Sequence, residues 1–269
     1  MKNSGMKKWI ISVLLLLFLV LTATFFLPKP KSEILKSTDI VAVINGEPVE
    51  LGEFFIILRQ NKSAVFDRFK VFIDTVGSIS DDVFWNKQYN GIKPLDQLKE
   101  VTLQKLIGIK IEQQLARKNG LISEFNYTIF VEMWRRENKR RKKAVENNEA
   151  IYGPMQHHMD YYYKYLYTIM VTDLKEKLGQ KDFVINPDQI EDYYHQNKEK
   201  YKNFDLTGGL MNATSKNMGY KTIAEAKDNI VDQLVGEQYT KLVEDEIQAT
   251  RVELNHKVIH AIGIELQIE

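Results

Sequence analysis

The chain has 269 residues, of which 44% are hydrophobic and 27% are charged, so it is long enough to bury one or two hydrophobic cores. Its formal net charge is +1, and nothing in that overall charge favours nucleic acid or another polyanion as a partner. It has no cysteine, which excludes a disulfide scaffold, a thiolate zinc site and a cysteine nucleophile.

The N-terminal segment predicts a membrane anchor. A basic tail, residues 1–8 with Lys2, Lys7 and Lys8, precedes the uncharged apolar run 9–27. At 1.5 Å per residue this run approaches the roughly 30 Å thickness of a bilayer's hydrocarbon core. The lysines favour a cytoplasmic N-terminus, so we expect a single-pass membrane protein with its bulk outside the cell membrane. The alternative is a cleaved signal that leaves a secreted protein.

After a Pro- and Lys-containing linker, residues 28–38, the next segments predict one strand and several helices. A short strand covers Val41 to Val43, and Asn45-Gly46 is a tight-turn signal that leads into a helix from Glu50. Further helices are expected at 95–119, 124–148 and 159–178, then from 187 and from 222. The first of these carries a stripe of Leu95, Leu98, Leu106, Ile109 and Ala116 and ends at Gly120, a typical C-cap residue. Ser123 is the expected cap of the following helix.

The C-terminal segment alternates between polar and apolar residues. Val258, His260, Ile262, Ile264, Leu266 and Ile268 would lie on one face of an extended strand. Strands near the two ends of the chain could pair with each other. The expected fold class is therefore mainly α with one small sheet.

Three stretches of this sequence are similar to one family. They are "VAVINGEPVELGEF" at 41–54, "LQKLIGIKIEQQLARKNGL" at 103–121 and "INPDQIEDYYHQNKEKYK" at 185–202. They resemble the entry strand and first helix, the core helix and the exit helix of the extracytoplasmic SurA/PrsA-type chaperones, relatives of parvulin prolyl isomerases. The resemblance implies a SurA/PrsA/trigger-factor-like helical chaperone domain. Its first part would span 39–205, and a returning helix and strand at 222–269 would complete it.

The resemblance also implies that a catalytic module is missing. PrsA-like members insert a whole parvulin domain between the two flanking helices, whereas this chain has only a short loop at 206–221. A parvulin active site needs a small sheet and paired histidines, and residues 203–221 contain no histidine. The family relationship therefore implies chaperone activity without catalysis, with no catalytic residue, cofactor or metal.

A chaperone of this kind needs exposed apolar and aromatic surface to bind unfolded polypeptides without ATP. The run "YYYKYLY" at 161–167 is the best candidate, because tyrosine combines a large apolar face with a polar end. The candidate client-binding groove consists of Phe54, Phe55, Tyr161, Tyr162, Tyr163, Tyr165, Tyr167 and Met170. The alternative is that this helix packs most of its aromatic rings into the core.

The run "RRENKRRKK" at 135–143 predicts either a solvated helix end or a contact with an anionic surface such as lipid headgroups. Its candidate contact residues are Arg135, Arg136, Lys139, Arg140, Arg141, Lys142 and Lys143. The neighbouring His157 and His158 point in different directions on a helix, so we expect exposed turn residues there, without a metal site.

Two other functions remain open. One is a prolyl isomerase with a shortened module, and the other is an anchored scaffold for one specific partner. The expected partners are unfolded polypeptides and the membrane, with nucleic acid disfavoured. A homodimer is possible, although no heptad pattern demands it.

Overall fold

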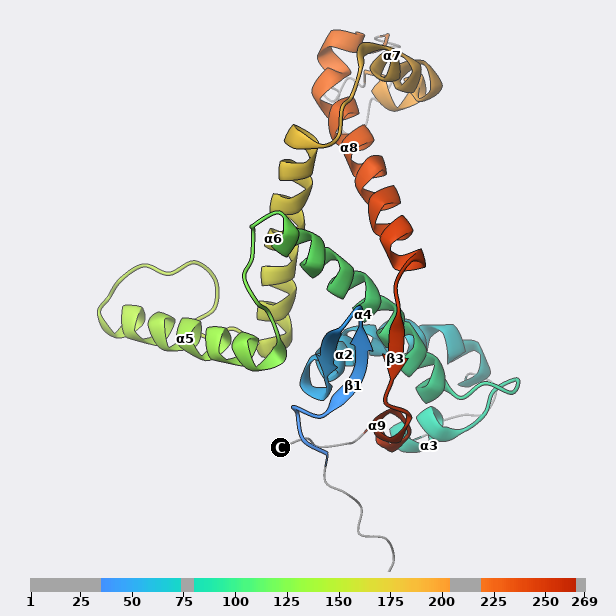
Figure 1. Ribbon diagram of the computed structural model, residues 1–269, viewed down its shortest axis with the longest axis vertical. Helices are drawn as coiled ribbons and strands as arrows, with labels where there is room; N and C mark the ends of the chain where they lie inside the picture. The colour runs from blue at the N-terminus through green and yellow to red at the C-terminus, as the bar shows by residue number, and fades with distance from the viewer. Residues whose placement is uncertain (1–34, 74–79, 204–218, 265–269) are drawn as a thin grey trace, which may run out of the picture. The chain divides into compact units, whose positions relative to one another are not determined.

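The computed structural model describes residues 35–73, 80–203 and 219–264 (Figure 1). The chain divides into the units Met1–Leu35 and Lys36–Glu269, and every helix and strand named below belongs to the second unit. The expected anchor at 9–27 lies outside the described residues and stays a prediction. No helix within the described ranges is both long and apolar enough to cross a membrane.

A small antiparallel sheet joins the two ends of this unit. Its strands are β1 (Ile40–Ile44), β2 (Glu47–Glu50) and β3 (Val252–Leu254), in the order β2-β1-β3. Asn45 and Gly46 connect β1 to β2 with φ angles of 48° and 85°, and two successive positive φ angles identify a type I′ hairpin turn. The predicted turn and the predicted pairing of strands from opposite ends of the chain are both confirmed.

Two long helices form the core beside this sheet. Helix α2 (Leu51–Ile73) packs along α4 (Pro94–Lys118), and the predicted buried stripe of α4 is confirmed at Leu98, Leu106 and Ala116, each 0% exposed. The α4 helix ends in a Schellman motif: Gly120 has φ 68°, and the amide of Leu121 donates to the carbonyl of Ala116.

The short helix α3 (Asp81–Asn86) was not predicted. The α3 helix contacts α4 (Figure 1), and its Phe84 and Trp85 side chains are buried, 1% and 0% exposed. With few residues and little periodicity, such a helix forms because its aromatic side chains are buried by neighbours distant in sequence.

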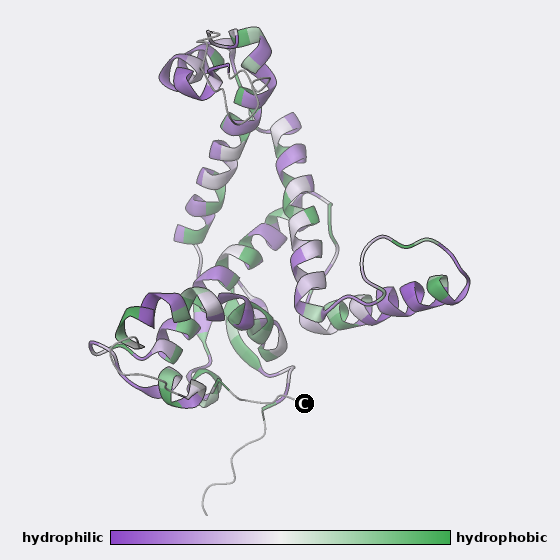
Figure 2. Ribbon diagram, turned by 180° about the vertical axis from the view of Figure 1, so that it is seen from behind, coloured by the Kyte–Doolittle hydropathy of each residue, from purple (hydrophilic) through white to green (hydrophobic). Residues whose placement is uncertain are grey.

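Helices α5 (Tyr127–Glu146) and α6 (Met159–Lys181) follow. The predicted cap Ser123 is wrong: Asn126 is the N-cap of α5, and its side chain accepts a hydrogen bond from the amide of Ile129. Figure 2 shows that most of α5 is hydrophilic, whereas α2 and α4 carry more apolar residues. The α6 helix runs a little beyond its predicted end at 178.

A second core forms where α4, α6 and α8 (Ile223–Gln248) meet. It contains Ile111 and Leu115 from α4, Leu174 from α6 and Tyr239 from α8. The helices α6 and α8 approach closely at Gly179, where an added Cβ would lie 3.2 Å from a methyl group of Val235.

The segments that flank the short loop meet in space. Asn186 begins α7 (Pro187–Gln196) with a capping box, as the Asn-Pro signal predicts. The short 3-10 helix η1 (Lys198–Tyr201) follows, and α7 and η1 share a small core with the start of α8. Lys202 pairs with Tyr220 in an isolated bridge, which brings the two ends of the loop together. Most of the loop itself, residues 204–218, lies outside the described residues.

The prediction that Val258, His260 and Ile262 lie on one face of an extended strand is wrong, and Leu266 and Ile268 of the same alternating segment lie outside the described residues. The C-terminal strand is the earlier β3, and residues His256–Ala261 form helix α9. Asn255 starts this helix, because its side chain accepts a hydrogen bond from the amide of Val258. Val258 within this helix and Ile262, the residue that follows it, are 6% and 2% exposed and therefore buried. Residues 265–269 lie outside the described residues.

Candidate functional site

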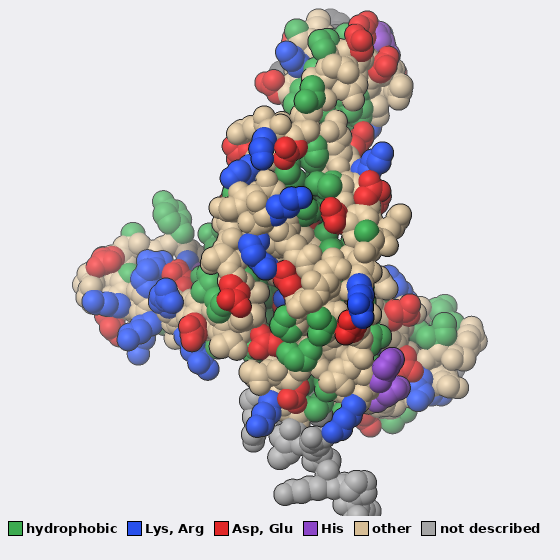
Figure 3. All heavy atoms as spheres, viewed as in Figure 1, with side chains coloured by type: hydrophobic (Ala, Val, Ile, Leu, Met, Phe, Trp, Pro, Cys, Tyr) green, Lys and Arg blue, Asp and Glu red, His purple; other side chains and the backbone are tan. Residues whose placement is uncertain are grey.

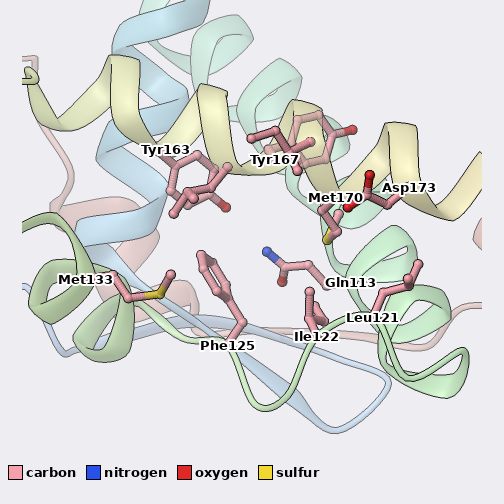
Figure 4. A pocket seen from close by; sticks show the side chains of 11 residues that line it. Gln113, Leu121, Ile122, Phe125, Met133, Tyr163, Tyr167, Met170 and Asp173 are labelled. Carbon is pink, nitrogen blue, oxygen red and sulfur yellow. The ribbon is translucent and has the colours of Figure 1, made fainter. Parts of the chain in front are cut away.

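A mostly apolar cleft lies between α6, the end of α4, the following connection and the start of α5 (Figure 4). Its volume is about 190 Å³. The α4 helix contributes Gln113, and the connection and α5 contribute Leu121, Ile122, Phe125 and Met133. The residues from α6 are Tyr163, Leu166, Tyr167, Ile169, Met170 and Asp173.

The two tyrosines of the cleft have their hydroxyl groups occupied elsewhere. The hydroxyl of Tyr163 donates to Oε1 of Glu53 on α2 at 2.7 Å, and that of Tyr167 donates to Glu112 on α4. Because the hydroxyls are bound by these carboxylates, the aromatic rings supply apolar surface to the cleft. Tyr163 is 2% exposed and forms part of its closed inner end.

A buried ion pair supports this arrangement. Nζ of Lys110 lies 2.8 Å from Oε2 of Glu53, and both side chains are only 1% exposed. Burial, followed by the charge of Glu53, raises the pKa of Tyr163 well above its usual range. Tyr163 therefore keeps its proton at neutral pH and remains a hydrogen-bond donor to the carboxylate. The three side chains join α2, α4 and α6 beneath the cleft.

A second carboxylate joins α4 to both α6 and α8. Glu112 accepts hydrogen bonds from Tyr167 and from Tyr239, the latter at 2.7 Å through Oε1. Burial and the neighbouring carboxylate raise the pKa of both tyrosines. The helices that form the cleft are thus connected by buried hydrogen bonds as well as by apolar contacts.

Gln113 places a polar group at the inner end of the apolar cleft. It is 3% exposed, and its Oε1 has no hydrogen-bond partner in the part of the chain that the structure describes. The Gln113 side chain lowers the pKa of Tyr163, against the larger effect of burial, which raises it. Figure 4 shows the Gln113 carboxamide facing the space among Phe125, Ile122 and the α6 side chains.

The outer rim of the cleft is accessible. Ile169 is 40% exposed, and Asp173 is exposed one helical turn further along α6. Asp173 is the one ionisable carboxylate among the lining residues, and within the described residues its carboxylate makes no ion pair.

The structure divides the predicted groove residues among three places. Tyr163, Tyr167 and Met170 line the cleft. Phe54 and Phe55 do not, because α2 packs against α4 and the sheet and leaves these rings 0% and 5% exposed. Their assignment to a binding groove is therefore wrong.

The remaining tyrosines, Tyr161, Tyr162 and Tyr165, stack with His157 on another side of α6. The His157 ring lies at 24°, 16° and 18° to these rings, and it is only 8% exposed, so the expectation of an exposed turn residue is wrong there. Its carbonyl accepts a hydrogen bond from Nε1 of Trp134, which fixes this segment against α5. Burial, assisted by the charge of Arg141, lowers the pKa of His157.

Most of the basic run is on the surface. Figure 3 shows basic side chains gathered over α5. The exposed residues are Arg135, Arg136, Lys139, Arg140, Lys142 and Lys143. The prediction that Arg141 contacts an anionic surface is wrong. Arg141 is 8% exposed and donates from Nη1 to the carbonyls of Tyr152 and Pro154, both at 2.8 Å. It holds the α5–α6 connection in place and is not available to an anionic surface.

Sequence periodicity did not reveal Gln113, Phe125 or Met133. A signal existed for Gln113, because it follows Leu106 and Ile109 on the buried stripe of α4, where a polar residue is unusual. Among the described residues no group of three or more His, Asp or Glu side chains is arranged to hold a metal ion.

Comparison with known proteins supports the family resemblance. No family model matches the chain. Foldase protein PrsA of Caldanaerobacter subterraneus subsp. tengcongensis is 33% identical over 85 residues, which are 32% of this chain and 25% of that protein. The predicted resemblance to SurA/PrsA-type chaperones is confirmed at the level of sequence, and the match spans about a quarter of the relative's length.

A solved structure from Campylobacter jejuni, described under a title on PEB4 and Cj1289 as "two structurally related SurA-like chaperones", is also similar. It shares 11% identity with a TM-score of 0.37, over 81% of this chain and 99% of that one. A similarity at that TM-score does not establish a shared fold.

Proposed function

We propose that this chain is an extracytoplasmic chaperone or folding factor. It binds apolar segments of unfolded secreted or surface polypeptides in the α6 cleft and releases them without a catalytic step. The apolar segment 9–27 tethers it to the membrane from which such polypeptides emerge. The observation that carries the proposal is the preformed apolar cleft, and the sequence similarity to a PrsA foldase supports it.

The size of the cleft suits weak and tolerant binding. A volume of about 190 Å³ accommodates one large apolar side chain. Burying such a side chain stabilises a complex by about 1.5–3 kcal/mol before the cost of association is included. One contact of that strength gives a short-lived complex that exchanges among many clients, and neighbouring apolar groups add to it.

The exposed basic face of α5 gives the tethered protein a second contact. Basic side chains near an anionic bilayer contribute about 1 kcal/mol each, and the effect decreases with salt. We propose that Arg135, Arg136, Lys139, Lys142 and Lys143 provide this contact. The paired Arg140 contributes less, because Glu137 already accepts two of its hydrogen bonds.

The test is suppression of aggregation. A chemically unfolded client is diluted into buffer that contains the full chain in phosphatidylcholine nanodiscs, and light scattering is followed over time with empty nanodiscs as reference. We expect suppression at near-stoichiometric ratios. The substitution Ile169→Asn removes apolar surface from the rim and should weaken suppression several-fold.

Val145→Asn is the matched control. Val145 is 41% exposed on α5, compared with 40% for Ile169 on α6, and it does not line the cleft. Equal loss of suppression in both variants, or no suppression by the wild-type chain at several-fold excess, would contradict the proposed cleft. Acceleration of proline-limited refolding at substoichiometric concentration would instead establish catalysis.

A further inference from the structure

We infer that His256 and His260 of α9 form a surface binding site for a divalent transition-metal ion such as Zn²⁺ or Cu²⁺. The two residues stand one helical turn apart, and the centres of their rings are 6.4 Å apart with 31° between the ring planes. Imidazole is the commonest metal ligand in proteins, and two histidines at i and i+4 on one helix can bind the same ion. Neither residue lines the α6 cleft, so the site is separate from the proposed client-binding surface.

The two rings need little movement to share an ion. A metal lies about 2.0–2.1 Å from each ligating nitrogen, so the ring centres of a bound pair would be about 5 Å apart. A modest rotation of the two side chains closes the difference. Both residues are exposed, and among the described residues neither imidazole has a hydrogen-bond or ion-pair partner. The ring nitrogens are therefore accessible to an ion from solution.

The backbone of α9 is already held in the conformation that the site requires. The side chain of Asn255 caps the helix and also donates to the carbonyl of Ile40 on β1 at 3.0 Å. Val258 is buried, and Nζ of Lys99 donates to the carbonyl of Ile259 at 2.9 Å. Because these contacts fix the backbone, a metal ion has to order only the two histidine side chains, which lowers the cost of binding.

The ion would bind the helical form of this segment and not an extended form. In a helix a separation of four residues spans about 6 Å along the axis. In a strand the same separation spans about 13 Å, and two imidazoles that project in parallel from one face do not meet at one ion. The alternating sequence at 256–262 also suits a strand, so an ion that binds only the helix shifts the balance toward α9.

Two protein nitrogens make an exchangeable site. Structural zinc sites have four protein ligands, whereas within the described residues no group of three or more metal-binding side chains is arranged to hold an ion, so water would complete the coordination here. The ammonium group of Lys99, which is bound to the same helix, also opposes a cation. Nitrogen ligands favour Cu²⁺ over Ni²⁺ and Zn²⁺, and Mg²⁺ prefers oxygen. This order of ions is expected from the pair of imidazoles alone.

The experiment is a calorimetric titration of the tag-free full chain in phosphatidylcholine nanodiscs with Zn²⁺, with empty nanodiscs as reference. It is carried out at about pH 8, because neutral imidazole is the form that binds a metal. We expect saturable zinc binding, tighter binding of Cu²⁺ and no binding of Mg²⁺. His256→Ala and His260→Ala should each weaken zinc binding by at least about tenfold, because the second ring no longer binds intramolecularly.

Two controls separate this pair from other imidazoles. His158→Ala removes an exposed histidine that makes no side-chain capping bond at the start of α6, and this variant should bind zinc like the wild type. His260→Ala combined with Ala261→His keeps the number of imidazoles but turns one of them by about 100° around the helix, so zinc binding should stay as weak as in His260→Ala.

Hydrogen exchange measures whether the ion stabilises α9. Zinc should slow exchange of the Ile259 amide, which donates to the carbonyl of Asn255, in the wild type and not in His260→Ala. Zinc binding that survives both single substitutions, or no saturation below about 1 mM zinc, would overturn the site. Binding without slower exchange at Ile259 would overturn its effect on the helix.

Discussion

The buried pair of Glu53 and Lys110 allows a quantitative test of the structure beneath the cleft. Both side chains are 1% exposed and 2.8 Å apart, and the Tyr163 hydroxyl donates to the same carboxylate. The substitution Lys110→Met removes the cation and leaves Glu53 buried with one neutral donor. We expect it to lower the free energy of unfolding by about 3–5 kcal/mol, the usual cost of breaking a buried ion pair from one side.

The same geometry predicts how related variants combine. Tyr163→Phe removes one hydrogen bond to a buried charge and should cost about 1.5–3 kcal/mol. Glu53→Leu combined with Lys110→Met removes both charges, so the double variant should be more stable than the Lys110→Met variant alone. The coupling between the two positions then appears as strong non-additivity.

Equilibrium unfolding in urea measures these differences, with fluorescence from the buried Trp85 as the main probe. Lys142→Met is the control, because Lys142 and Glu146 lie 4.0 Å apart with side chains 66% and 60% exposed, and an exposed pair contributes little. A cost below about 1 kcal/mol for Lys110→Met, or additive effects of the two charge removals, would refute the buried pair.

Three further variants test other contacts. His157→Phe keeps the ring stack and removes the titratable group. Because folding lowers the pKa of His157 from 6.5, protonation favours the unfolded chain. Thermal unfolding should therefore show that the wild type loses more stability than the variant as pH falls below about 6.5. Gly52→Ala places a Cβ 2.2 Å from the Tyr127 ring and should cost about 1–3 kcal/mol in urea unfolding, but much less when Tyr127→Ala is also present. Arg141→Met removes the hydrogen bonds that hold the α5–α6 connection, so limited proteolysis within 147–158 should be faster while the unfolding of the core is little changed.

The elements that local chemistry determines could be predicted from the sequence. The turn at Asn45-Gly46 needs two residues that accept positive φ angles, and Asn186-Pro187 supplies a cap and a proline at the first helical position. The stripe of α4 has a clear helical period, so its buried face and its end near Gly120 were also predictable. In each case a few neighbouring residues contain the whole reason for the structure.

The predictions were wrong where the structure depends on residues distant in sequence or on competing local signals. The alternating C-terminal segment suits a strand, but the side chain of Asn255 caps a helix there, and Val258 and Ile262 are buried equally well four residues apart. Phe54 and Phe55 were assigned to a groove because periodicity identifies an apolar face without identifying what covers it. In the structure α2 packs against α4 and the sheet, and both rings are buried.

The tyrosines of α6 show why the candidate site could be predicted only in part. The run at 161–167 was predicted either to line a groove or to pack into the core, and in the structure it presents rings to two separate places. Which rings line the cleft depends on the acceptors available to their hydroxyls: Tyr163 and Tyr167 reach Glu53 and Glu112. Those carboxylates belong to other helices and have no sequence motif.

This arrangement links the stability of the chain to the shape of its cleft. The hydroxyl of each lining tyrosine is fixed by a buried carboxylate, so the rings cannot turn their polar ends into the cleft without breaking a charge-assisted hydrogen bond. An apolar lining built from tyrosine is therefore preorganised, which reduces the ordering cost when a client side chain enters.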